Sequence, residues 1–231
     1  GAFDNRAGAV FGQGAITVNA SSVDNSGGGS LQGANDLTLR AQQLNNAGGA
    51  ISVGRNADLL LPGVLDNRSG LVAAAGTLTV QAASVDNRNT LSGPNGPALG
   101  LQGKQLLLTS GGLDNQQGQV LADNLKVQLS NQLNNAGGLV SASQTSEIRA
   151  DSIANAGGTL VAGTSLLAFR YNLAMGLAEL QATGRHRLDL YAASLEREID
   201  KYAYFPTTLG LEKDVLHLLA APSPRPEQVD Q

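Results

Sequence analysis

Short apolar segments alternate with turns rich in Asn and Gly along the first two thirds of the chain. Segments 37–39 (Leu-Thr-Leu), 78–80 (Leu-Thr-Val) and 125–127 (Leu-Lys-Val) place apolar side chains at every second position. This period of two, bounded by Gly and Asn, is typical of short β-strands and not of helices. The pattern therefore predicts an all-β structure over this part of the chain.

One asparagine marks an internal repeat. It follows an apolar residue and usually an Asp or Asn, and it recurs at Asn5, Asn25, Asn46, Asn67, Asn87, Asn115, Asn135 and Asn155. Consecutive positions differ by 20, 21, 21, 20, 28, 20 and 20 residues. Such a unit is shorter than the common helical repeats, and the leucine-rich repeat spacing is absent. We therefore predict a right-handed parallel β-helix, a solenoid of ~20-residue coils with three short strands each, stacked about 4.8 Å apart.

The column of asparagines has a structural interpretation. Asn tolerates the left-handed backbone of a sharp corner. Identical amides stacked in register also form a hydrogen-bonded ladder. Glycines follow most of these asparagines, and glycine accepts positive φ and allows close stacking of backbones. We expect these eight asparagines to be structural.

The longest step contains an insertion at residues 89–97. Its sequence ends in Pro94, Asn95, Gly96 and Pro97, which predicts a turn-rich loop outside the regular coil. A tolerated surface loop is the favoured interpretation, and a binding loop is the alternative.

Composition narrows the function classes. A formal net charge of −4 gives no basis for binding nucleic acid or an anionic membrane. The absence of cysteine excludes disulfides and thiolate zinc sites. No apolar run reaches 18 residues and no N-terminal signal is visible, so we expect an internal piece of a larger protein. We also expect the chain to be monomeric.

The repeat resembles a known family. The pattern Leu-Asp-Asn-x-x-Gly-x-Val/Leu, followed by Leu-x-Leu/Val-x-Ala, is clearest over 65–82 and 113–129. It is similar to the haemagglutinin repeats of filamentous haemagglutinin and of contact-dependent growth-inhibition exoproteins (the CdiA type), over residues 1 to about 164. The resemblance implies a filament on the bacterial cell surface, secreted through an outer-membrane two-partner-secretion transporter. It implies a role in adhesion, or in toxin delivery during growth inhibition, with this segment mainly as a stalk. The family's secretion domain and its Val-Glu-Asn-Asn motif are not visible here.

The composition changes after residue 163. Six of the eight aromatic residues and only three of the 29 glycines follow it. Segment 188–195 nevertheless repeats the pattern of 78–85, so we expect 165–197 to continue the regular domain, 1–164, as degenerate coils. The spacing of leucines after residue 210 predicts a short α-helix within a C-terminal cap at 198–220. Three prolines predict a flexible linker at 221–231.

The aromatic and basic residues of this tail form the candidate recognition surface. Exposed Tyr with Arg is typical of surfaces that bind proteins or glycans. The candidate contacts to a receptor on a target cell are Phe169, Arg170, Tyr171, Arg185, Arg187, Tyr191, Tyr202 and Tyr204. Capping and core filling are the alternative role of the same rings.

An enzymatic function is an alternative, because parallel β-helices also include polysaccharide-active enzymes. The acidic column at Asp24, Asp66, Asp86 and Asp114 is interrupted by Asn45, which disfavours calcium. His186, between Arg185 and Arg187, is a weak candidate for a nuclease or RNA-cleaving toxin centre, and a solvated turn is the favoured interpretation of these residues. We therefore predict no enzymatic activity, no metal and no cofactor.

Overall fold

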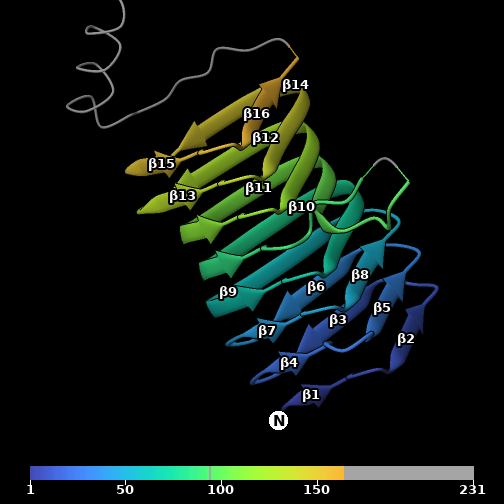
Figure 1. Cartoon of the computed structure of the whole chain (residues 1–231). Coiled ribbons are helices and arrows are strands. Elements are labelled where there is room, and N and C mark those ends of the chain that lie inside the picture. Colours follow the sequence, from blue (N-terminus) through green and yellow to red (C-terminus); the bar gives the residue numbers. More distant parts are fainter. Residues whose placement is uncertain (94, 164–231) are drawn as a thin grey trace, which may run out of the picture. The chain divides into compact units, whose positions relative to one another are not determined.

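The computed structural model describes residues 1–93 and 95–163, which wind into a parallel β-solenoid of about eight turns. Figure 1 shows the coils stacked in chain order, and residues 91–93 and 95–99 lie outside the strands of the stack. The all-β solenoid predicted from the repeat is confirmed for these residues. The described residues contain no helix, and accordingly none long and apolar enough to cross a membrane.

The early coils have separate short strands on three faces. The first face holds β2 (Ala9–Gly12), β5 (Ser30–Gly33), β8 (Ala50–Val53) and the late β16 (Thr159–Ala162). The second face begins with β3 (Ile16–Asn19) and β6 (Leu37–Arg40). The third face holds β1 (Phe3–Asp4), β4 (Val23–Asp24), β7 (Leu44–Asn45), β13 (Gln132–Asn134) and β15 (Ser152–Ala154).

In the middle coils the strands run on through the bends, where we expected three separate strands. The continuous strands are β9 (Ala57–Asp66), β10 (Leu71–Asp86), β11 (Gly100–Asp114), β12 (Gln119–Leu129) and β14 (Leu139–Arg149). They remain unbroken because the parallel ladder continues around the corner, with register irregularities such as those at Ala74/Thr77 and Ala82/Ser84. A bulge bends a strand and leaves the pairing on both sides intact.

Register places identical positions of successive coils on top of one another. On the second face Leu59 of β9 pairs with Val80 of β10, which pairs with Leu108 of β11. These three side chains point inward and are at most 1% exposed. Burying an aliphatic side chain of this size contributes about 1.5–3 kcal/mol, so the stacked columns are a main source of stability.

Three of the expected segments lie outside the described residues. They are the degenerate coils at 165–197, the cap with its helix at 198–220 and the linker at 221–231. The eight repeated asparagines lie at the corner where the third face leads into the first, and this corner is within the described residues in all eight coils.

Candidate functional site

The side chains of the eight repeated asparagines form one continuous hydrogen-bonded ladder. Each Nδ2 donates to the Oδ1 of the asparagine one coil further along, and the seven rungs measure 2.6 to 2.8 Å. The asparagines from Asn25 to Asn135 are fully buried. All rungs point in the same direction, and aligned hydrogen bonds of this kind strengthen one another.

Asn46 illustrates why the ladder needs an amide. Its Oδ1 accepts from Asn25 Nδ2 at 2.8 Å, and its Nδ2 donates to Asn67 Oδ1 at 2.7 Å. The same Nδ2 also lies 2.9 Å from the Leu71 carbonyl oxygen and 3.4 Å from that of Gly49. The amide supplies a donor and an acceptor on separate atoms, whereas an Asp carboxylate has no donor and a Leu side chain has neither, so neither Asp nor Leu replaces it without loss.

The left-handed backbone at this corner does not lie at the asparagine, where we expected it. It lies two residues later in every coil, at Ala7, Gly27, Gly48, Ser69, Asn89, Gln117, Gly137 and Gly157, with φ between 49° and 65°. The ladder asparagine keeps negative φ, which lets its side chain point into the coil stack. The strained position therefore falls on an outer turn residue and is tolerated even where that residue is not glycine.

The next glycine has a different role, because it allows close approach of two coils. At Gly49 an added Cβ would overlap the carbonyl oxygen of Asn25 in the coil before, and at Gly138 it would overlap that of Asn115. The positive-φ requirement and the close-approach requirement thus belong to two adjacent positions of the turn.

The acidic column next to the ladder supplies acceptor oxygens to the turn. Asp66 Oδ1 accepts the backbone N–H of Arg68 at 3.1 Å, and Asn45 Oδ1 accepts that of Ala47 at 3.2 Å. Either side chain supplies the acceptor oxygen of such a turn, which explains why Asn interrupts the column without changing the coil. Within residues 1–93 and 95–163 no group of three His, Cys, Asp or Glu side chains is placed to hold a metal ion.

Arginines two positions after the aspartates bridge successive coils. Arg68 lies 2.7 Å from Asp66 in its own coil and 3.6 Å from Asp86 in the next, while Arg88 lies 2.7 Å from Asp86 and 3.6 Å from Asp114. The hydrogen bond from Arg68 lowers the pKa of Asp66, and the Asp66 carboxylate raises the pKa of Arg68.

The same arrangement occurs in the first coil. Arg6 lies 2.6 Å from Asp4, and its side-chain hydrogen bond lowers the pKa of that carboxyl to about 2. Our sequence analysis missed these ion pairs. The recurring tripeptide Asp-Asn-Arg at 4–6, 66–68 and 86–88 is the signal that predicts them.

At the insertion a threonine hydroxyl replaces a backbone carbonyl. In a regular coil the first residue of the first face donates its N–H to the close-approach glycine of the previous coil, as Leu139 does to Gly118 at 2.8 Å. Thr90 occupies the glycine position before the loop, and its Oγ1 accepts the N–H of Gln119 at 3.0 Å. The same hydroxyl donates to the Asn87 carbonyl at 2.9 Å, so the corner stays closed although the chain leaves it.

Gln119 and Gly100 fix the other end of the loop. Gln119, which is 5% exposed, donates through Nε2 to the Leu99 carbonyl at 2.9 Å and to Ser92 Oγ at 3.3 Å. Gly100 returns to the stack by donating to the Gly70 carbonyl at 2.7 Å. The regular coil therefore resumes at Gly100, slightly after the expected loop boundary.

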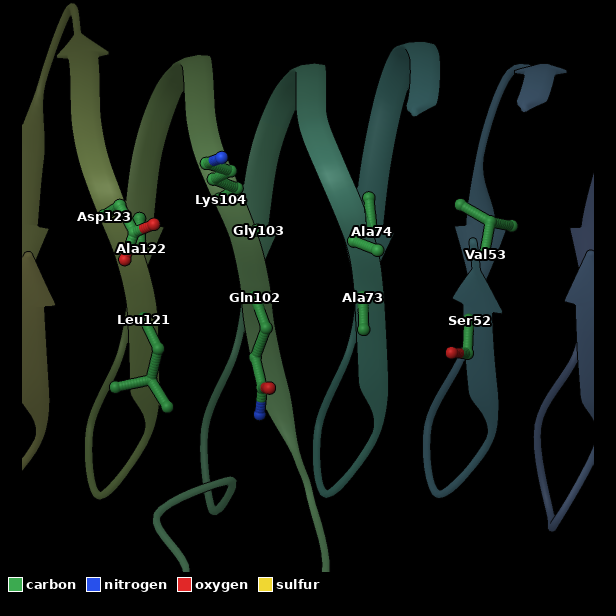
Figure 2. Close-up of a pocket in the computed structure, with 11 residues that line it drawn as sticks. Ser52, Val53, Ala73, Ala74, Gln102, Gly103, Lys104, Leu121, Ala122 and Asp123 are labelled. Atoms are coloured by element: carbon green, nitrogen blue, oxygen red, sulfur yellow. The ribbon is translucent and has the colours of Figure 1, made fainter. Parts of the chain in front are cut away.

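A shallow hollow lies on the first face, where Figure 2 shows its lining on four successive coils. Its floor contains the small residues Ala73, Gly103 and Ala122, with Lys104 and Asp123 beside them. Asp123 already accepts a hydrogen bond from Ser143 Oγ at 2.7 Å. We find no combination of nucleophile, base and oxyanion donor among these residues.

The candidate receptor contacts lie outside the described residues. They are Phe169, Arg170, Tyr171, Arg185, Arg187, Tyr191, Tyr202 and Tyr204, and the same holds for His186 and His217. The features of the described part of the chain are therefore the asparagine ladder, the corner that carries it and the insertion.

The comparisons with known proteins agree with this architecture. No curated protein and no solved structure matches the chain. The haemagglutinin repeat family matches it three times, over residues 1–61, 53–124 and 120–168. These matches cover most of the 231 residues and all of the described coils, so this chain belongs to the haemagglutinin repeat family.

Proposed function

We propose that this chain is a stalk segment of a filament secreted to the bacterial cell surface, where it holds other elements away from the cell. The unbroken asparagine ladder across all eight coils supports this proposal most strongly. A repeating unit that joins to the next through the same rungs is suited to length and stiffness. Membership of a family of secreted and surface proteins is consistent with that role.

The absence of an assembled chemical site within the described coils agrees with a scaffold. The carboxylates beside the ladder accept hydrogen bonds from turn residues or pair with Arg, as Asp66 does with Arg68. We propose no enzymatic activity for the chain. Its resemblance to two-partner-secretion exoproteins makes an outer-membrane transporter the proposed partner in export.

A stalk tolerates the removal of a whole coil and does not tolerate the removal of half a coil. Deleting residues 47–67 joins Asn46 to Arg68 and preserves the turn sequence, and it shortens the stack by about 4.8 Å. Deleting residues 47–56 instead moves the inward columns out of register. We expect the first variant to keep cooperative unfolding by circular dichroism and surface display in the parent filament, and the second to lose both. Equal loss in both variants would contradict a modular stalk.

A second proposal is that the tail binds a receptor, a protein or a glycan, on a neighbouring cell. Its support is the concentration of six of the eight aromatic residues after residue 163. The choice between adhesion and contact-dependent growth inhibition of the CdiA type depends on this receptor role.

The receptor proposal is tested with tyrosine variants of the full chain. Tyr171, Tyr191, Tyr202 and Tyr204 are changed to Ser together, and binding to target cells is measured by flow cytometry. We expect loss of binding with an unchanged far-ultraviolet spectrum. The control changes the exposed Phe11 of β2 to Ser, because this residue lies in the regular coils. Unchanged binding by the tyrosine variant would leave the chain as a stalk only.

A further inference from the structure

The insertion contains the only Asn-Gly pair in the sequence, Asn95-Gly96. Both residues are exposed. None of the hydrogen bonds within residues 1–93 and 95–163 involves the Asn95 side chain. The Gly96 N–H donates to the Gly93 carbonyl at 2.9 Å, which is the one backbone bond at this turn. We propose that Asn95 is a site of spontaneous deamidation, assisted by the backbone of Gly96, and that it is where this protein first changes chemically.

The reaction needs only water. The backbone nitrogen of Gly96 attacks Cγ of Asn95, a new N–Cγ bond forms, and the bond from Cγ to the side-chain nitrogen breaks. That nitrogen leaves as ammonia and a five-membered succinimide remains. Water then opens the ring at either carbonyl, which gives aspartate or isoaspartate. Because glycine has no Cβ, its nitrogen reaches Cγ with less steric hindrance than that of any other residue.

The ladder asparagines are held in a way that prevents the same reaction. Asn46 is fully buried, and both polar atoms of its side chain are fixed by hydrogen bonds. The attacking nitrogen would belong to Ala47, whose Cβ hinders its approach to Cγ.

The exposed asparagines of the regular coils differ from Asn95 in a second respect. Asn19 precedes Ala20 and Asn131 precedes Gln132, so a side chain hinders the attacking nitrogen in each case. Exposure and a following glycine occur together only at Asn95.

The consequence is confined to the loop and goes beyond the stalk proposal. Deamidation adds one negative charge, and the isoaspartate product also adds one carbon to the backbone path. Thr90 and Gly100 anchor the loop on its two sides through their own hydrogen bonds. The modified loop therefore presents a new anionic surface while the coils stay unchanged.

The test is a time course on the full chain at neutral and mildly alkaline pH, followed by tryptic peptide mapping and mass spectrometry. We expect the peptide 89–104 to convert first, with fragmentation assigning the change to Asn95. The rate rises with pH, since the attacking nitrogen must lose its proton. Gly96→Ala slows the conversion by an order of magnitude, and Asn95→Gln abolishes it.

Three results would overturn the proposal. The first is that Asn95 stays intact while other asparagines convert. The second is that the Gly96→Ala chain converts as fast as the parent, and the third is that a ladder asparagine converts at the same rate as Asn95. The urea midpoint of the fully converted chain is measured alongside. An unchanged midpoint supports confinement to the loop, and a lowered midpoint contradicts it.

Discussion

Removing one ladder asparagine in the middle of the stack gives the sharpest test of the fold's energetics. Asn46→Ala deletes the rungs to Asn25 and Asn67, at 2.8 and 2.7 Å, and the bond to the Leu71 carbonyl at 2.9 Å. Each intramolecular hydrogen bond contributes about 1 kcal/mol net, and a buried acceptor left without a donor costs about 1–3 kcal/mol more. Asn67 Oδ1 becomes such an acceptor, whereas Asn25 Nδ2 keeps the Gly29 and Ala50 carbonyls. We expect a loss of about 4–6 kcal/mol in the free energy of unfolding.

Asn46→Asp separates the need for a donor from the need for volume. The new carboxylate accepts from Asn25, but it faces the Oδ1 of Asn67 and places a buried charge there. We therefore expect a larger loss than for Asn46→Ala at neutral pH. Burial raises the pKa of this carboxyl, so the variant gains stability relative to the parent as the pH falls through that raised value, because the protonated acid donates again.

The assay is urea unfolding followed by far-ultraviolet circular dichroism, which suits a chain without tryptophan. Asn19→Ala is the matched control, since this asparagine is exposed at the end of β3, and a change within about 0.5 kcal/mol is expected. If Asn46→Ala costs no more than Asn19→Ala, or if Asn46→Asp matches the parent at neutral pH, the ladder does not stabilise the coil stack.

Three further predictions address the corner. Gly70→Ala is expected to cost more than 3 kcal/mol by urea unfolding, because the new Cβ overlaps a carbonyl of the coil before. At Gly27 the new Cβ meets open space, so Gly27→Ala costs only about 1–2 kcal/mol for a left-handed residue with a side chain. Equal losses would argue against separate positions for the left-handed backbone and for the close approach of coils. Thr90→Val should cost about 1–3 kcal/mol, because the buried N–H of Gln119 loses its acceptor. Thr90→Ser keeps a hydroxyl and should retain most of this stability, and a loss as large as that of Thr90→Val would contradict the role of the hydroxyl. Hydrogen bonds from arginine lower the pKa of Asp4, to about 2, and that of Asp66. The stabilisation by these two carboxylates is therefore complete above the unfolded pKa near 3.8 and is lost as the pH falls through the lowered values. The urea midpoint should drop between about pH 4 and 2, less steeply in high salt, and an unchanged midpoint in this range would refute the contribution.

Much of the fold followed from the repeat. The steps of 20 and 21 residues between asparagines set the coil length, and the alternation at 37–39 and 78–80 placed the inward columns. These features are predictable because each coil makes the same contacts with its neighbours, so one register satisfies all of them. The expectation of stacked asparagine amides rested on the same periodicity.

The sequence did not show which corner residue adopts the left-handed backbone and which one allows the close approach of two coils. It suggested a left-handed asparagine, but the left-handed residue is two positions later and the glycine after it serves close approach, as Ser69 and Gly70 illustrate. Backbone conformation at a turn depends on which atoms of the neighbouring coil lie beside it, and those atoms are about 20 residues away in the chain.

The sequence by itself determined the repeat, the coil length and the inward columns, because these depend on local periodicity repeated in register. Only the tertiary structure decided which side chains complete the joins between coils. Arg68 reaches Asp86 across a coil boundary, and the Thr90 hydroxyl takes the place of a carbonyl for Gln119. The tripeptide Asp-Asn-Arg signals the ion pair within one coil. The partners across coils are 18 and 29 residues apart, and they follow from the positions that stacked backbones leave open.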